Sequence, residues 1–202
     1  MSNQKELFKK ISNIKLFYEG YHNKTYKGFF CGELVQIRIV KNNIVNHVNE
    51  IKLLTNQSDI IYIDNSIMIK KWVPGHHLNT NDINTLKNIK LSLNQHWNTK
   101  IDGITFFDNA TNVKDIVLSH GDLRPQNIIV NDYQDIVLID FEWTNYNSKY
   151  FDLSHLYLYC SFAIDDIVSV FNVDKEKLLK AVINVRKFNT NWEKKEYKKN
   201  LD

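Results

Sequence analysis

One stretch of the sequence combines acidic, amide and basic side chains at close, fixed intervals. It runs from Leu118 through Ser-His-Gly-Asp-Leu-Arg-Pro-Gln to Asn127, and Ile139-Asp-Phe-Glu142 follows it. Asp122 and Asn127 are five residues apart, and Asn127 and Asp140 are thirteen apart. Phosphoryl transfer from ATP needs a carboxylate beside the attacking hydroxyl and oxygen ligands for Mg²⁺ on the phosphates. The pattern His-x-Asp-x-x-x-x-Asn followed by Asp-Phe supplies that set.

A predicted β-hairpin places these residues near one another. Residues 127–130 and 136–139 are apolar runs typical of strands, and the turn Asp132-Tyr133-Gln134-Asp135 joins them. The return strand would bring Asp140 back beside Asn127, so that both can share one metal ion. The alternative interpretation is a polar turn in which a buried aspartate caps backbone amides.

The same residues resemble a known family. HGDLRPQN is similar to the catalytic loop of the choline kinase and aminoglycoside phosphotransferase superfamily, relatives of protein kinases. IDFEWTNYNSKYFDL, which Asp152 closes, resembles the choline and ethanolamine kinase branch more than the aminoglycoside branch. The resemblance covers residues 17–159. It implies an α+β, protein-kinase-like fold of two lobes: a small antiparallel β N-lobe and a mostly helical C-lobe that contains the catalytic hairpin.

The resemblance also implies a role for each matching position. Asp122 would be the catalytic base, His120 a scaffold for its loop, and Asp152 a structural acceptor of hydrogen bonds near that loop. ATP and Mg²⁺ would be the cofactors, with Asn127 and Asp140 as magnesium ligands. Further expected site residues are Glu142, which matches the family's acidic residue after Asp-Phe, and Arg124, which we expect to reach the γ-phosphate.

Hydrophobic patterning predicts the elements around this motif. Residues 14–18, 25–30, 34–40, 60–63 and 66–72 are predicted strands, and residues 43–55 a helix with Asn43 as its N-cap. Pro74-Gly75 breaks the pattern and marks the boundary between a nucleotide-binding lobe, residues 1–73, and a catalytic lobe, residues 74–202. Residues 82–97 form a predicted amphipathic helix, and the chain from Asp152 onward is predicted to be helical throughout.

The N-terminal lobe matches the family more weakly. Gly20 and Asn23 fit the turn that covers the nucleotide, and Arg38 occupies the strand position of the phosphate-binding cation, with Glu50 as its partner on the helix. A surface salt bridge on an edge strand is the alternative for that pair. The segment from Lys70 to Gly75 aligns with the family's hinge, where backbone amides would bind adenine, and Lys71 and Trp72 are its expected nucleotide contacts.

The acceptor is less well defined. A quaternary ammonium group is held by aromatic faces, and the stretch from Trp143 to Phe162 is rich in aromatic residues. The residues after Asp152 are not acidic overall, which favours an amino alcohol such as choline over a polycationic aminoglycoside. Candidate substrate contacts are Trp143, Tyr157, Tyr159 and Gln126. Tyr159 stands where choline kinases tend to have an acid, and few residues follow, so a homodimer is one way to complete the lobe.

Composition narrows the function classes. Lys and Arg number 26 against 23 Asp and Glu, a net charge of +3 that gives no argument for nucleic acid as a partner. The longest nearly apolar run is too short to span a membrane, and no export signal or CxxC pattern is present, so we expect a cytoplasmic chain. Two alternatives stay open: another small-molecule kinase acting on an aminoglycoside, thiamine or a sugar, or a pseudokinase that binds nucleotide or a partner.

Overall fold

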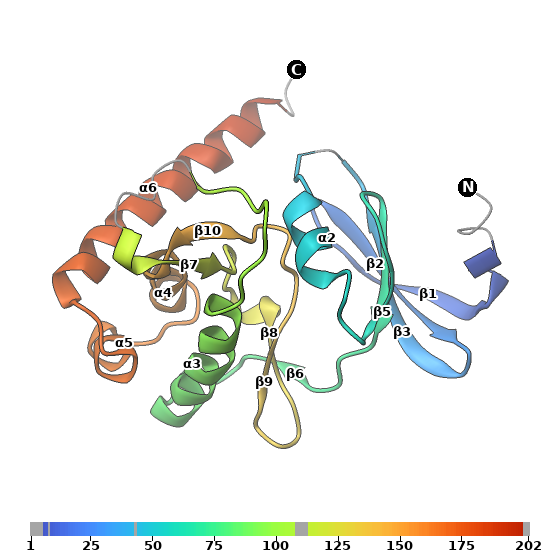
Figure 1. The fold of residues 1–202 in the computed structure, drawn as a ribbon, viewed down its shortest axis with the longest axis horizontal. Helices are drawn as coiled ribbons and strands as arrows, with labels where there is room; N and C mark the ends of the chain where they lie inside the picture. Colours follow the sequence, from blue (N-terminus) through green and yellow to red (C-terminus); the bar gives the residue numbers. More distant parts are fainter. Residues whose placement is uncertain (1–5, 8, 43, 108–112, 200–202) are drawn as a thin grey trace. The chain divides into compact units, whose positions relative to one another are not determined.

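The chain divides into two compact units in the computed structural model, which describes residues 6–7, 9–42, 44–107 and 113–199. The N-terminal unit is Met1–Val73 and the C-terminal unit is Pro74–Asp202. Figure 1 shows the labelled elements of both, coloured along the sequence. None of the described helices combines the length and the hydropathy needed to cross a bilayer.

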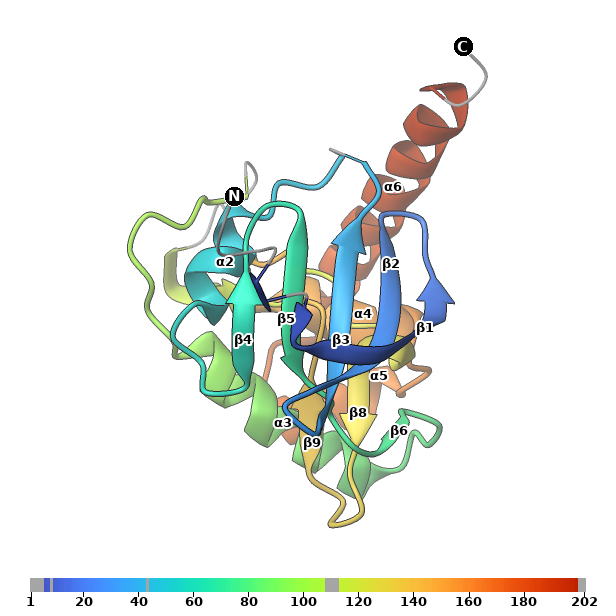
Figure 2. The same cartoon turned by 90° about the vertical axis from the view of Figure 1, so that its right-hand side faces the viewer.

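A five-stranded antiparallel sheet forms most of the N-terminal unit. Its strand order is β1-β2-β3-β5-β4, with bounds β1 (Ile11–Glu19), β2 (Asn23–Phe30), β3 (Glu33–Val40), β4 (Ile60–Ile63) and β5 (Ile67–Lys71). β1 curves across the face of the sheet (Figure 2), and two register irregularities against β2 accompany the curvature. The predicted strands are therefore confirmed.

Strand β3 presents two different faces, as its alternating sequence predicts. Val35 and Ile37 are fully buried in the sheet core, whereas Arg38 points from the opposite side. The following helix, α2 (Val48–Leu54), begins five residues later than predicted. The proposed cap Asn43 lies outside the described residues.

Two small sheets form the framework of the C-terminal unit. β6 (His76–His77), β8 (Ile128–Val130) and β9 (Ile136–Leu138) form one, and β7 (Ile116–Ser119) pairs with β10 (Asn145–Ser148) in the other. The β8–β9 pair is the predicted hairpin, which is confirmed. Gly75 allows β6 to approach β8, because a Cβ atom there would lie 2.4 Å from the Val130 carbonyl oxygen.

Helices pack around these sheets. α3 (Ile83–Trp97) is the predicted helix, and the side chain of Asp82 caps its first amides. It contacts both β7 and β9. The chain after Asp152 is mostly helical, but the prediction of helix throughout is wrong at two short connections, which separate α4 (Lys149–Leu158), α5 (Ile164–Phe171) and α6 (Lys175–Lys199). Ser161 and Asn172 take left-handed backbone conformations between them, which ends each helical run.

Candidate active site

The candidate active site of the C-terminal unit lies on the loop that leaves β7. This loop, residues 120–124, leads into the short 3₁₀ helix η2 (Pro125–Asn127) and then into β8. The register of the β8–β9 hairpin continues one residue beyond the strands, because the Ile139 amide donates to the Asn127 carbonyl oxygen at 3.0 Å. Asp140 therefore directly follows the residue that pairs with Asn127.

Asp152 anchors the backbone of this loop from helix α4. Its side chain is fully buried, and each carboxylate oxygen accepts two hydrogen bonds. Oδ1 accepts from the Ser119 hydroxyl at 2.8 Å and the Gly121 amide at 3.0 Å. Oδ2 accepts from the Trp97 indole at 2.8 Å and the His120 amide at 3.0 Å. The expected structural role of Asp152 is confirmed.

His120 connects the loop to the Asp-Phe-Glu segment. Its Nε2 donates to the Ile139 carbonyl oxygen at 2.9 Å, and its Nδ1 accepts from the Asp122 amide at 3.3 Å, a pairing that fits the tautomer protonated at Nε2. Gly121 has φ +84°, and a Cβ atom there would lie 2.3 Å from the Trp143 carbonyl oxygen. Only glycine allows the two backbones to approach this closely.

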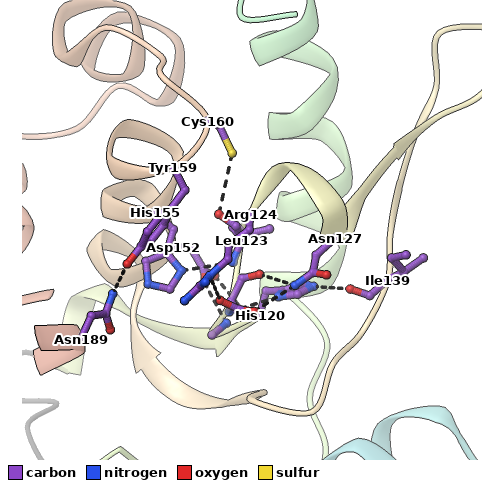
Figure 3. Close-up of polar contacts among 12 residues, drawn as sticks. His120, Leu123, Arg124, Asn127, Ile139, Asp152, His155, Tyr159, Cys160 and Asn189 are labelled. Atoms are coloured by element: carbon purple, nitrogen blue, oxygen red, sulfur yellow. Dashed lines mark hydrogen bonds and ion pairs between the residues drawn. The ribbon is translucent and has the colours of Figure 1, made fainter. Parts of the chain in front are cut away.

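The Asp122 carboxylate is held by two neighbours and still reaches solvent. Asn127 Nδ2 donates to Oδ2 at 3.0 Å and to the Asp122 carbonyl oxygen at 2.8 Å. Arg124 Nε donates to Oδ1 at 2.7 Å, and its guanidinium carbon lies 4.6 Å from the centre of the Tyr159 ring. The Asp122 side chain is 21% exposed, so a ligand can reach it. Figure 3 labels Arg124, Asn127 and Tyr159 among the polar contacts of this region.

The residues expected to hold magnesium offer only oxygen ligands. Asn127 uses its amide nitrogen on Asp122, which leaves Oδ1 as an acceptor, and Asp140 adds a carboxylate. Asp140 has φ +65°, a left-handed conformation that is uncommon among residues other than glycine and is often found at functional sites. In the described part of the chain, no group of three His, Cys, Asp or Glu side chains could cage a metal. Mg²⁺ needs no such cage, because one or two protein ligands complete its shell together with phosphates and water. The donor set fits.

Two buried histidines beside the loop, His96 and His155, have pKa values far below normal. Burial, the main cause, lowers each pKa to about 4. His155 Nδ1 accepts the Leu123 amide hydrogen at 3.1 Å, which requires the unprotonated nitrogen. We call these two residues the low-pKa histidines. They pack the loop as neutral rings.

The expected substrate contacts are distributed unevenly around Asp122. Tyr159 lies against Arg124, and its hydroxyl accepts a hydrogen bond from Asn189 of α6 at 2.5 Å. Trp143 is half-buried beside Gly121, and Glu142 is buried in the same turn. Gln126 and Tyr157 are exposed, and among the described residues no polar or ring contact joins them to the loop.

In the N-terminal unit, Arg38 forms the expected pair with Glu50. Both side chains are buried and Arg38 lies on the central strand β3, so the alternative of a surface salt bridge on an edge strand is wrong. His47 Nδ1 lies 2.9 Å from Glu50 Oε2. Burial by itself would raise the pKa of Glu50, but the Arg38 charge and the hydrogen bonds from His47 and Arg38 outweigh it and hold the pKa at about 2.

The remaining expected nucleotide contacts of the N-terminal unit lie in the turn at Gly20 and in the hinge at Lys71 and Trp72. The Gly20 amide donates to the Asn23 carbonyl oxygen at 2.9 Å and closes a tight turn between β1 and β2. The backbone amides of Lys71 and Trp72 donate to the carbonyl oxygens of Asp59 and Leu34 in the same unit. These two amides are therefore already used, and binding of adenine by the expected hinge, Lys70 to Gly75, stays a prediction. Trp72 would have to act through its ring.

Sequence reasoning missed several supporting residues. Trp97 was predicted only as part of an apolar stripe, yet its indole binds Asp152. Ser119 and Gly121 flank His120 inside the motif, and this position was the only sign in the sequence that they support the loop. Asn189 lies 30 residues from Tyr159 on another helix, and no local pattern indicates that contact.

Comparisons with known proteins agree with this geometry. The family model for choline/ethanolamine kinase matches residues 8–200. An uncharacterized protein of Metamycoplasma hominis is 32% identical in an alignment 212 residues long, which covers 96% of this chain. The chain spans only 42% of the length of that relative.

Solved structures show the same fold. A choline kinase from Streptococcus pneumoniae matches with a TM-score of 0.65 and 14% identity, over 95% of this chain and 90% of that chain. A spectinomycin phosphotransferase in complex with ADP and spectinomycin matches with a TM-score of 0.57 and 13% identity, over 89% and 83% of the two chains. The predicted α+β, kinase-like fold is confirmed. With its family model matching nearly every residue, the chain belongs to the choline/ethanolamine kinase family.

Proposed function

We propose that this protein transfers the γ-phosphoryl group of ATP, with Mg²⁺, to the hydroxyl group of a small molecule, and that an amino alcohol such as choline or ethanolamine is the preferred acceptor. The position of Asp122 carries the proposal. Its carboxylate is fixed by Asn127, stands on a loop anchored by buried contacts, and is accessible to a ligand. Membership of the choline/ethanolamine kinase family supports the same reaction.

The reaction needs one base and a set of charge-stabilising groups. The acceptor hydroxyl oxygen forms a bond to the γ-phosphorus, the bond from that phosphorus to the bridging oxygen breaks, and ADP leaves. Asp122 orients the hydroxyl and takes its proton. Magnesium, when bound, would neutralise charge on the phosphate oxygens, and Asn127 and Asp140 would hold it. Arg38, fixed by Glu50, is suited to bind phosphate because a guanidinium group offers several donors in one plane.

The surroundings of Asp122 favour a cationic acceptor. Tyr159 presents a ring face that already accommodates a cation, the guanidinium group of Arg124. Choline has no N–H donors, so aromatic contact and its single hydroxyl are the features available for recognition. The structural match to a spectinomycin phosphotransferase keeps aminoglycosides among the acceptors to be tested.

The test is a comparison of phosphoryl transfer between the wild type and Asp122→Asn. Release of ADP is measured with choline, ethanolamine, kanamycin and thiamine as separate acceptors. We expect turnover of choline or ethanolamine, and a loss of about 10²- to 10⁴-fold in kcat for Asp122→Asn with little change in the KM for ATP. Asp132→Asn, at the exposed hairpin turn, is the matched control. Equal activity in the wild type and in Asp122→Asn would contradict the assignment of Asp122 as the base. Absence of transfer to any of the four acceptors would favour a pseudokinase.

A further inference from the structure

Arg124 makes the two contacts that a cationic acceptor would need. Its Nε donates to Asp122 Oδ1 at 2.7 Å, where the acceptor hydroxyl would donate its hydrogen. Its guanidinium carbon lies 4.6 Å from the centre of the Tyr159 ring, the kind of aromatic face on which an ammonium group is stabilised. One side chain of the protein therefore occupies both the carboxylate and the aromatic surface.

We propose that Arg124 is an internal latch that occupies the acceptor site and must leave Asp122 and Tyr159 before a cationic acceptor can bind. The triphosphate of the nucleotide is the ligand chemistry that would draw it away, because a guanidinium group binds phosphate oxygens with several parallel donors. The latch makes acceptor binding depend on prior nucleotide binding. This inference rests on the proposed function and adds an order of binding to it.

The backbone around Arg124 is fixed, so the motion belongs to the side chain. The preceding residue, Leu123, is fully buried. Its amide donates to His155 Nδ1 at 3.1 Å, and its carbonyl oxygen accepts a weak hydrogen bond from Cys160 Sγ at 3.8 Å. The Arg124 side chain, in contrast, is 39% exposed. Figure 3 labels Arg124 and Tyr159 together with Leu123, and with His155 and Cys160, which hold the Leu123 backbone.

The Tyr159 ring is held independently of Arg124. Asn189 of α6 donates to the Tyr159 hydroxyl at 2.5 Å, and the ring stands edge-on to His155 with centroids 5.3 Å apart. When Arg124 leaves, the ring therefore stays in place as a surface for an incoming cation.

The strength of the latch suits a displaceable group. A partly exposed ion pair and one cation–π contact together give a latched-to-open ratio on the order of three to ten. The apparent affinity for the acceptor is reduced by the same factor, since only the open form binds it. Removing the guanidinium should therefore tighten acceptor binding in the absence of nucleotide, whereas a merely structural role for Arg124 predicts weaker binding.

The main test measures acceptor binding by titration calorimetry without nucleotide, using the acceptor that the transfer assay identifies. We expect Arg124→Gln to lower the Kd by about three- to ten-fold relative to the wild type. The kcat of the same variant should fall, because the phosphate loses a cationic partner. Arg186→Gln, which changes an exposed arginine of α6, is the matched control and should leave both values unchanged. An unchanged urea midpoint shows that the variants remain folded.

A second readout follows Arg124 directly. The chain contains only three arginines, Arg38, Arg124 and Arg186, so their Nε–H signals are readily resolved in a ¹⁵N NMR spectrum. We expect a nonhydrolysable ATP analogue with Mg²⁺ to shift the Arg124 signal, and ADP to shift it much less. The Arg186 signal should not move.

The outcomes separate the two proposals. Transfer activity together with an unchanged or weaker acceptor Kd in Arg124→Gln would overturn the latch and leave the proposed function in place. An Arg124 signal that does not respond to the ATP analogue in an active enzyme would also overturn it. Absence of transfer to every acceptor would overturn both proposals.

Discussion

Replacing Asp152 by asparagine should lower the free energy of unfolding more than replacing any one of the residues that donate hydrogen bonds to it. The asparagine side chain keeps one oxygen, so two of the four hydrogen bonds to this position are lost, and its NH₂ group then faces two buried donors. A hydrogen bond to a charged group contributes about 1.5–3 kcal/mol. The expected loss is therefore about 3–6 kcal/mol, a large fraction of the 5–15 kcal/mol by which a domain is typically stable.

Single-partner variants set the scale for this loss. Ser119→Ala and Trp97→Phe each remove one hydrogen bond to Asp152 and should cost about 1.5–3 kcal/mol. Asp132→Asn makes the same chemical change at an exposed turn and should cost less than about 0.5 kcal/mol. Together these variants separate the loss of the carboxylate from the loss of one donor.

Urea unfolding followed by tryptophan fluorescence measures the free energy of unfolding of each variant at pH 7. The same proteins are tested for phosphoryl transfer, because Asp152 holds the amides of His120 and Gly121 immediately before Asp122. We expect kcat to fall in Asp152→Asn even at temperatures where the variant is folded. A loss in Asp152→Asn no larger than that in Asp132→Asn would refute the reasoning that these four bonds anchor the loop.

Three further predictions concern buried contacts. Gly121→Ala places a Cβ atom 2.3 Å from a carbonyl oxygen and should cost more stability than Gly32→Ala, which has a similar positive φ but open space; urea midpoints of the two test this. Glu50→Gln removes the negative charge that compensates the buried Arg38 guanidinium and should cost about 3–5 kcal/mol, whereas Glu33→Gln breaks an exposed pair and should cost less than about 1 kcal/mol. The low-pKa histidines have folded-state pKa values below the unfolded value of 6.5, so the unfolded state takes up their protons first and stability falls as the pH drops from about 6.5 to about 4. Between pH 7 and 5 the free energy of unfolding should decrease by about 4 kcal/mol, roughly half from each histidine, and a flat profile would contradict their burial as neutral rings.

Local patterns predicted the elements whose signal is local. The alternation in β3 and the apolar stripe of α3 each lie within one element, so the sequence alone could assign them. The prediction that the chain is helical throughout after Asp152 failed at two short connections, where Ser161 and Asn172 adopt left-handed conformations. Asparagine often ends helices in this way, so Asn172 offered a signal that the prediction did not use, whereas Ser161 offered none. Strand β10, with the polar sequence NYNS, was missed because pairing with β7, and not hydrophobicity, defines it.

The residues of the site also divide into those that a local motif could identify and those that depend on tertiary structure. The spacing of Asp122, Asn127 and Asp140 is a property of one loop and one hairpin, so the motif could identify them. The hydrogen bonds of the Lys71 and Trp72 amides depend on tertiary register, and the sequence could not show that they were already used. The roles of the motif residues in catalysis stay predictions until the transfer assay is done.

Helix α4 contributes no reacting group to the proposed chemistry, yet the loop depends on it. The amides of His120, Gly121 and Leu123 all donate to side chains of this helix. These contacts fix the backbone on both sides of Asp122, while the Arg124 side chain is left partly exposed. Phosphoryl transfer requires a fixed base, since the carboxylate must stay aligned with the attacking hydroxyl. In the proposed latch, only the Arg124 side chain moves. Because the backbone is fixed by α4, a change in this helix should alter kcat without altering any group that touches the substrate.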